Sequence, residues 1–265
     1  MNAILRVTDL RKAYAGVHAL DGVSFDVAAG SITGLIGPNG SGKSTAIDCV
    51  SGFQKLDGGQ VVLAGIDITG RPSHLIARAG LMRTFQTVRI YERLSLRDNL
   101  AIAAQQFDDA TFVDEFFRTR RYREAIEASE MRARELVELI GLRKYYEIET
   151  GILSYGQKKL VALASALMPR PKIVVLDEPV AGVNPSRIRE IEEALRQLNR
   201  AGETFLIVEH NVEFITNLCH QVIVLEQGRK LTEGTAAEIH TDSRVLEAYL
   251  GMSPEMAAAE MRGAA

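Results

Sequence analysis

The chain has 265 residues, of which 46% are hydrophobic and 25% charged, and its formal net charge is −3. These values are ordinary for a folded globular protein and exclude a wholly disordered, collagen-like or disulfide-stapled chain. A net charge this small provides no basic field for holding a nucleic-acid backbone, so no nucleic-acid partner is expected. The two cysteines, Cys49 and Cys219, match no metal-binding spacing and indicate a reducing compartment.

No apolar run approaches the roughly 20 residues that a membrane-spanning helix needs, and the N-terminus has no signal-peptide core. We therefore expect a soluble cytoplasmic protein whose membrane role, if it has one, comes through a partner.

Short apolar runs bounded by glycine and aspartate predict strands in the first 70 residues, at 4–7, 23–27, 32–36 and 61–64. Residues 96–142 contain almost no glycine or proline, which favours helices. From residue 172 the pattern alternates again, with strands predicted at 173–176, 204–208 and 221–225 and helices between them. This order predicts an α/β fold with a parallel sheet and a helical block inserted between two pieces of that sheet.

A phosphate-binding loop follows the strand predicted at 32–36. The segment matches the pattern G-x-x-x-x-G-K-[ST] and consists of Gly37, Pro38, Asn39, Gly40, Ser41, Gly42, Lys43, Ser44 and Thr45. Its backbone N–H groups must point at a polyphosphate, which needs glycine conformations, and the helix that follows favours anions at its N-terminus. Lys43 would reach the β- and γ-phosphates and Ser44 would ligate Mg²⁺. The alternative is a chance glycine-rich turn before a helix.

Two adjacent acids, Asp177 and Glu178, end the apolar strand predicted at 173–176. Adjacent carboxylates are costly at the end of a buried strand unless they have a function. Asp177 can hold Mg²⁺ through its water shell. If the strand continues, Glu178 faces the other way and can polarise the water that attacks the γ-phosphate. The alternative is a pair of solvated acids at a turn.

A third motif, Leu153-Ser154-Tyr155-Gly156-Gln157, stands shortly before this strand and resembles the L-S-G-G-Q signature of ATP-binding-cassette (ABC) ATPases. The resemblance covers about residues 3–251. It extends to Gln86, which matches the glutamine loop, to His210, which matches the switch histidine, and to Tyr14, which matches the aromatic residue that stacks on adenine.

The resemblance implies roles for these residues. Glu178, His210 and Lys43 would be catalytic, and Gln86 would contact Mg²⁺ or water beside Ser44 and Asp177. Each residue also has a plainer interpretation: Tyr14 as a strand-end aromatic, Gln86 as a solvated loop residue and His210 as a helix cap.

The signature motif would act on the γ-phosphate held by a facing protomer, through Ser154, Tyr155, Gly156 and Gln157. The chain departs from the family pattern twice. Tyr155 replaces the first signature glycine, and Asn184 stands where the family usually has aspartate.

A closer resemblance is to the ATP-binding subunits of branched-chain amino acid importers, carried by the run at residues 81–100, the helical insert after it and the Leu-Ser-Tyr-Gly-Gln motif. Cassettes for urea or short-amide uptake and for lipopolysaccharide export look similar. A soluble ABC ATPase outside transport is a further alternative, although the chain has neither long heptads nor a second cassette.

The fold that the resemblance implies is a phosphate-loop NTPase core with a mainly parallel sheet, an N-terminal antiparallel β subdomain and an inserted helical subdomain. We expect one ABC ATPase domain at 1–251, with core sheet at about 1–94 and 165–251 and helical subdomain at about 95–164. The tail at 252–265 would be helical or disordered.

The implied cofactors are ATP and Mg²⁺. The implied partners are permease subunits, a second ATP-binding subunit in a homo- or heterodimer and, indirectly, a substrate-binding protein. The expected location is the inner face of the cell membrane. The family places the permease contact beside the glutamine loop, here around residues 88–92.

Overall fold

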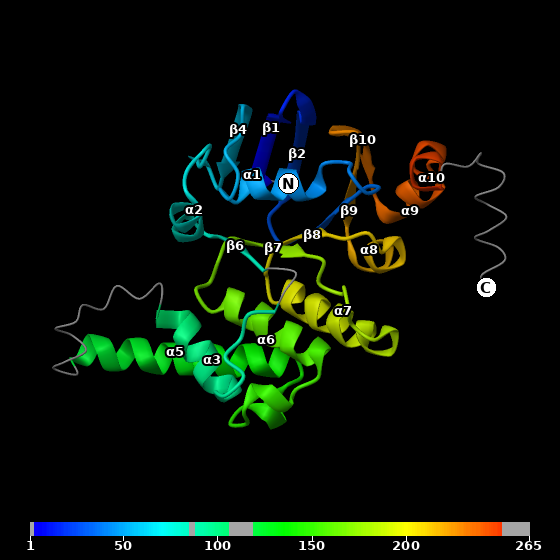
Figure 1. Cartoon of the computed structure of the whole chain (residues 1–265). Coiled ribbons are helices and arrows are strands. Elements are labelled where there is room, and N and C mark those ends of the chain that lie inside the picture. Colours follow the sequence, from blue (N-terminus) through cyan, green and yellow to red (C-terminus); the bar gives the residue numbers. More distant parts are fainter. Residues whose placement is uncertain (1–2, 85–87, 106–118, 251–265) are drawn as a thin grey trace.

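The first of two sheets is antiparallel and occupies one end of the molecule (Figure 1). The structure, a computed structural model, describes residues 3–84, 88–105 and 119–250. The strand order is β2-β1-β4-β5, with β1 (Ala3–Tyr14), β2 (Val17–Ala28), β4 (Gly58–Leu63) and β5 (Ile66–Asp67). The hairpin of β1 and β2 is longer than the predicted apolar runs because backbone pairing continues through polar residues to the Tyr14–Val17 pair.

The second sheet has the strand order β10-β9-β3-β8-β7-β6. Its strands are β3 (Ile32–Ile36), β6 (Leu81–Arg83), β7 (Ile173–Asp177), β8 (Phe205–Val208), β9 (Gln221–Glu226) and β10 (Arg229–Gly234). All neighbours pair in parallel except β9 and β10. The predicted combination of a mainly parallel sheet with an antiparallel sheet is therefore confirmed. The edge strands β6 and β10 were not predicted because neither carries a long apolar run.

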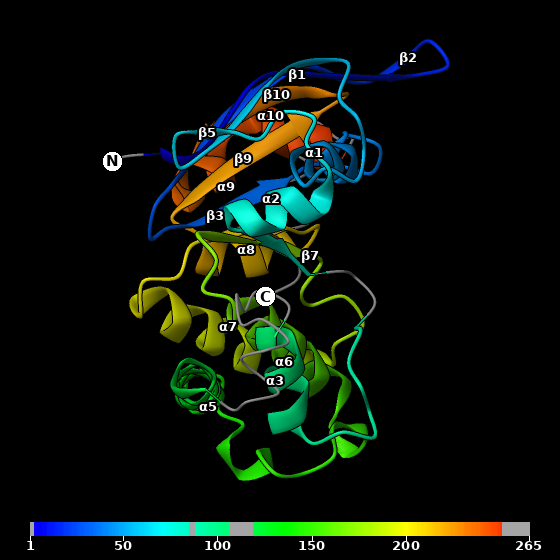
Figure 2. The same cartoon turned by 90° about the vertical axis from the view of Figure 1, so that its left-hand side faces the viewer.

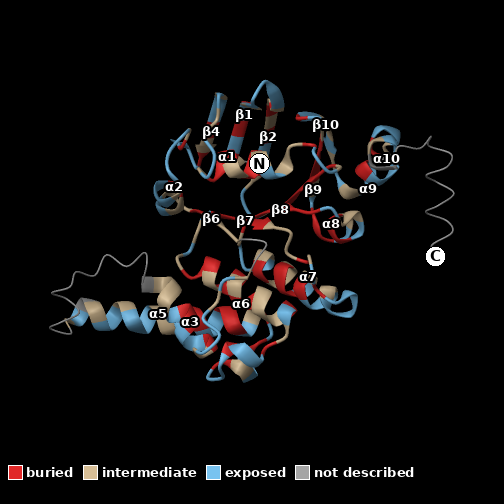
Figure 3. Cartoon of the chain, in the orientation of Figure 1, coloured by how far each residue is buried: buried red, intermediate tan, exposed pale blue. Residues whose placement is uncertain are grey.

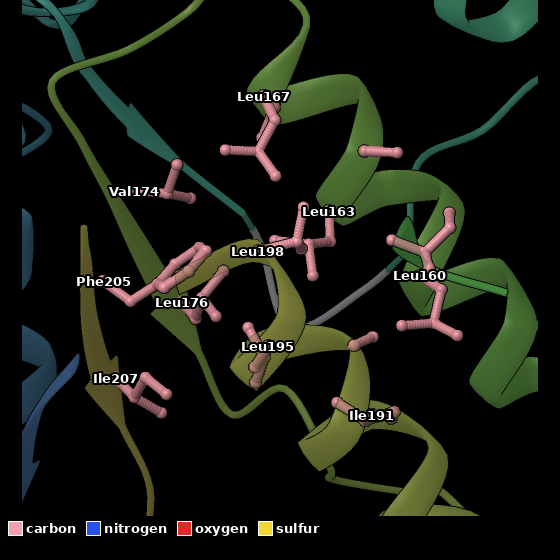
Figure 4. Packing of buried hydrophobic residues seen from close by; sticks show 14 of the residues in the cluster. Leu160, Leu163, Leu167, Val174, Leu176, Ile191, Leu195, Leu198, Phe205 and Ile207 are labelled. Carbon is pink, nitrogen blue, oxygen red and sulfur yellow. The ribbon is translucent and has the colours of Figure 1, made fainter. Parts of the chain in front are cut away.

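The parallel strands are apolar throughout because both faces of this sheet are buried. In β7, Val174 and Leu176 pack into one core cluster with the helices, whereas Ile173 and Val175 pack into a second cluster shared with the antiparallel sheet. Figure 4 shows the first cluster, in which β7 and β8 meet leucines of α6 and α7.

Helices surround the second sheet and extend away from it (Figures 1 and 2). On the side of the sheets lie α1 (Lys43–Val50), α2 (Ser73–Ala79), α8 (Val212–Leu218), α9 (Ala236–Thr241) and α10 (Ser243–Leu250). At the other end lie α3 (Leu96–Gln105), α5 (Arg120–Leu139), the short 3₁₀ helices η1 (Arg143–Tyr145) and η2 (Thr150–Ile152), and α6 (Tyr155–Leu167). Buried residues concentrate in α6 and in the sheet, while the first half of α5 is mostly exposed (Figure 3).

Helix α7 (Pro185–Arg200) begins at two local sequence signals. Asn184 is its N-cap and accepts a hydrogen bond from the Ser186 N–H at 3.1 Å, and Pro185 is the first helical residue. Its buried face includes Leu195 and Leu198.

Among the described residues, no helix combines the length and apolar character needed to cross a membrane.

Candidate nucleotide site

Three of the predicted motifs meet at the carboxyl ends of the parallel strands. The phosphate loop follows β3, Asp177 ends β7 with Glu178 directly after it, and His210 follows β8. Strand β8 pairs with both β3 and β7, so the three carboxyl ends are neighbours. In open α/β sheets, ligands bind outside the carboxyl ends of the strands. The topology thus brings together residues that are up to about 170 positions apart.

Two glycines of the phosphate loop, Gly37 and Gly42, stand where a side chain would not fit. A Cβ on Gly37 would lie 2.2 Å from the carbonyl oxygen of Leu225, and a Cβ on Gly42 would lie 2.6 Å from that of Ala19. Gly42 is also the N-cap of α1, with a φ of 101° and no side-chain capping bond. The loop therefore packs directly on neighbouring backbone and opens a helix whose first N–H groups have no capping side chain.

Lys43 is the first residue of α1, and its ammonium lies over the loop. Its Nζ donates to the carbonyl oxygens of Gly37 at 2.7 Å and Pro38 at 3.0 Å. Burial lowers the pKa of Lys43, and the charge of Glu178 partly opposes that shift. The next residue, Ser44, is exposed on the first turn of α1, and Thr45 is half-buried. Of the other loop residues, Asn39 and Gly40 are exposed.

Asp177 is the last residue of β7, and Arg83 of β6 holds its side chain. The Arg83 Nη2 donates to Asp177 Oδ2 at 2.8 Å, and the Asp177 side chain is 16% exposed. Glu178 has a left-handed φ of 48°. The strand therefore ends before it, and the expected alternation of the two acids along a continuing strand does not apply.

The carbonyl of Glu178 is bound by a residue that sequence analysis did not identify. Lys159 of α6 donates from its Nζ to the Glu178 oxygen at 2.6 Å. Burial lowers the pKa of Lys159, while the charges of Glu209, Glu178 and Asp177 raise it. The lysine therefore connects α6 to the end of β7.

His210 lies beside two carboxylates. Its Nδ1 is 3.9 Å from Glu178 Oε1 and 3.5 Å from Glu209 Oε2, and its side chain is 62% exposed. The helix that follows is capped by Asn211, whose side chain accepts from the Phe214 N–H. This excludes the interpretation of His210 as the helix cap.

Glu209 is a further residue that sequence analysis missed. It is fully buried, and its two oxygens accept from the backbone N–H groups of Val180 at 3.1 Å and His210 at 3.0 Å. The loop after β7 and the loop after β8 are thus joined through one carboxylate. The signal that could have found it is an acid directly following the apolar run of β8.

The signature motif forms the N-terminus of α6. Ser154 is the N-cap and Gln157 completes a capping box, with Ser154 Oγ accepting from the Gln157 N–H and Gln157 Oε1 accepting from the Ser154 N–H. Gly156 is buried, whereas Tyr155 is 43% exposed. A Cβ on Gly182 would lie 3.3 Å from Tyr155 Cε1, so the tyrosine ring lies against the loop that follows Glu178.

Of the two remaining predicted residues the structure describes Tyr14, and no hydrogen bond or ring contact among the described residues ties it to the loop. Tyr14 lies at the end of β1, 43% exposed, with the Lys12 ammonium 5.2 Å from its ring centre. Gln86 lies outside the described residues.

The donors present fit a nucleotide carrying Mg²⁺. Ser44 offers a hydroxyl and Asp177 a carboxylate, the hard oxygen ligands that Mg²⁺ prefers. Ser41 Oγ is buried and makes no hydrogen bond in the part of the chain that the structure describes, so it can serve a ligand in the loop. Among those residues no cluster of three or more His, Cys, Asp or Glu could hold a metal by itself. A site completed by phosphate oxygens fits this pattern.

Comparison with known proteins places the chain in a family. The ABC transporter family model matches residues 20–181. The chain is 33% identical to the high-affinity branched-chain amino acid transport ATP-binding protein BraF of Pseudomonas aeruginosa, over 94% of this chain and 98% of that one. It is 37% identical to the probable branched-chain amino acid transport ATP-binding protein LivG of Archaeoglobus fulgidus, over 94% and 95%.

Solved structures agree with this placement. The ADP conformation of MJ1267, an ATP-binding cassette of an ABC transporter, matches with a TM-score of 0.81 and 34% identity over 95% of this chain and 100% of that one. The structure of cbiO1 from Clostridium perfringens shares the fold, with a TM-score of 0.78 and 24% identity over 98% and 100%. The chain therefore belongs to the ABC transporter family, as one of its ATP-binding ATPase cassettes.

Proposed function

We propose that this chain hydrolyses ATP to energise a membrane importer of branched-chain amino acids. One observation carries the proposal of ATP hydrolysis: the phosphate loop, the two acids and His210 come together at three neighbouring strand ends. The transport part is supported by relatives named as branched-chain amino acid transport ATP-binding proteins, which align over 94% of this chain.

In the proposed site, Lys43 and the loop backbone bind the β- and γ-phosphates of ATP. Ser44 and Asp177 hold the Mg²⁺ ion, Asp177 through water, with Gln86 as the third predicted ligand. The ion supplies charge neutralisation for the phosphates. Glu178 orients and polarises the attacking water, and His210 binds the γ-phosphate.

We further propose that two cassettes pack head to tail with ATP between them. The N-terminus of α6 would then present Ser154, Tyr155, Gly156 and Gln157 to the γ-phosphate on the facing protomer, where its N–H groups and dipole favour an anion. Because ATP would bind the closed pair better than the open one, binding and hydrolysis would drive motion. The facing protomer is either a second copy of this chain or a different ATP-binding subunit.

The permease is proposed to dock in a groove beside residues 88–92, at the inner face of the membrane. This groove has a volume of about 730 Å³ and is lined by Val88, Ile90 and Tyr91 together with residues of α3 and α6. Asn99 fixes the backbone of Tyr91 through two hydrogen bonds, at 2.8 and 3.1 Å, while the tyrosine itself is 59% exposed. The rigid backbone and exposed ring suit a contact with a partner helix.

The test is reconstitution of this chain with permease subunits of its own organism in liposomes, together with their substrate-binding protein. We expect ATP-dependent uptake of leucine, isoleucine and valine, and none with a Glu178→Gln chain. Uptake of urea in place of these amino acids would overturn the substrate assignment. ATP turnover that does not respond to the permease would overturn the transport role.

A further inference from the structure

Arg83 of β6 lies at the centre of a partly buried ionic cluster that joins α1 to β7. Its Nη1 donates to Asp48 Oδ1 at 2.6 Å and to Ser51 Oγ at 3.1 Å, and its Nη2 donates to Asp177 Oδ2 at 2.8 Å. The Arg83 side chain is only 9% exposed. The ring of Phe53 lies 5.4 Å from its Cζ. The guanidinium is therefore bound on several sides.

The two carboxylates belong to two different elements of the nucleotide site. Asp48 is on α1, one helical turn after Ser44, and Asp177 ends β7. Ser44 and Asp177 are the two described residues proposed above to hold Mg²⁺. Through Arg83, the helix that carries the hydroxyl is tied to the strand that carries the carboxylate.

We propose that Arg83 is a positioning residue for the magnesium site, holding Asp177 and helix α1 at the separation that Mg²⁺ bound to a nucleotide requires. This inference rests on the metal site in the proposed function and adds the residue that orients it. Groups hydrogen-bonded to metal ligands fix the ligand geometry, and losing one typically costs about 10- to 100-fold in metal affinity. Because Asp177 would hold the ion through water, the loss should lie at the lower end of this range.

Arginine suits this role because of its shape. A planar guanidinium presents several N–H donors in a rigid fork and can bind two carboxylates at fixed directions, whereas an ammonium is a point charge on a flexible stem. Without the arginine, Asp48 and Asp177 would be two partly buried carboxylates that lack this common partner. They would repel each other and turn toward solvent.

The experiment titrates MgCl₂ into the full chain with a fluorescent ATP analogue, mant-ATP, and follows binding rather than turnover. We expect Arg83→Gln to raise the Mg²⁺ concentration at half-maximal response by about tenfold. The mant-ATP affinity measured in EDTA should change less than about twofold, since Asp48 and Asp177 do not form the phosphate loop. Arg83→Lys should restore part of the Mg²⁺ response.

Arg132 is a matched control. Its side chain is also 9% exposed and also binds two carboxylates, those of Glu135 and Glu203. Arg132 lies on α5, which Figure 1 shows at the other end of the molecule from α1. Arg132→Gln should lower thermal stability as Arg83→Gln does, but leave the Mg²⁺ response unchanged. Should Arg83→Gln not fold, Arg83→Lys is compared with Arg132→Lys in the same titration.

The possible results distinguish a failure of the Arg83 role from a failure of the metal site itself. An unchanged Mg²⁺ response in the Arg83 variants, or an equal shift in the Arg132 variants, overturns the positioning role while the metal site stands. A wild-type chain whose mant-ATP binding does not respond to MgCl₂ overturns the metal site and the role of Arg83 with it.

Discussion

Glu178 and His210 lie close together in the fold, although 32 positions separate them in the sequence. The Glu178 Oε1 is 3.9 Å from the His210 Nδ1, and the Glu178 backbone is held in a left-handed conformation by neighbours on β8 and α6. A residue kept at such a φ by surrounding contacts is a feature of functional sites. Its carboxylate lies beside the His210 imidazole, directly after the end of β7.

Glu178→Gln should bind ATP normally and lose hydrolysis, because the amide keeps the size of the side chain but cannot act as a base. We expect phosphate release to fall by at least about 100-fold, with mant-ATP affinity within about twofold of wild type. Glu190→Gln, on the exposed side of α7, is the control and should hydrolyse normally. Normal phosphate release by Glu178→Gln would contradict the assigned role.

Lys43→Ala should weaken ATP binding as well as hydrolysis. A hydrogen bond to a charged group contributes about 1.5–3 kcal/mol, so the ATP dissociation constant should rise by about 10- to 100-fold. Isothermal titration calorimetry measures this change. Lys55→Ala, which removes an exposed lysine, should leave affinity unchanged. Equal affinity in the Lys43 and Lys55 variants would refute the phosphate-loop assignment.

At the scale of elements, the parallel sheet is held against α6 and α7 by one continuous apolar cluster (Figure 4). Leu195 of α7 is fully buried within it. Leu195→Ala should lower the free energy of unfolding by about 2–5 kcal/mol, because the deleted methyl groups leave a cavity. Urea denaturation gives this value. Arg189→Ala on the exposed side of the same helix should change it by less than about 0.5 kcal/mol, and comparable losses in both variants would show that the α7 packing is not as described.

The loop before α3 is where a partner is proposed to bind. Tyr91→Ala should reduce co-purification with the permease and leave mant-ATP affinity unchanged, because Asn99 binds only the backbone at this position. Met131→Ala on α5 removes a side chain that is likewise exposed, at 64%, and should not affect co-purification. If the Tyr91 variant is retained by the permease as well as wild type, the docking surface lies elsewhere.

At the scale of the whole molecule, the signature motif and the phosphate loop stand on different parts of the chain, and the proposed reaction joins them across two protomers. A Glu178→Gln chain with MgATP should therefore accumulate as a dimer, since the γ-phosphate that bridges the protomers is not removed. Analytical ultracentrifugation should show the dimer with MgATP and the monomer with MgADP. A monomer under both conditions would count against the head-to-tail pair.

The sequence by itself determined the structural features that depend on neighbouring residues in the chain. The phosphate loop and the cap of α7 each lie within about ten consecutive residues, so their spacing predicts their backbone. The apolar runs of β3, β7 and β8 predict buried parallel strands because both faces of such strands are covered. The edge strands β6 and β10 could not be predicted, since β6 has only three residues and β10 has a single apolar residue, Leu231, among polar ones.

Only the tertiary structure decided which charged residues are buried and what they bind. Arg83 contacts Asp48 and Asp177, which are 35 and 94 positions away, and Lys159 binds the carbonyl of Glu178 from a different helix. Glu209 is buried between two loops. In the sequence these residues look like any solvated charge, because the stabilising partner of a buried charge comes from a distant segment and is chosen by the packing of the sheet.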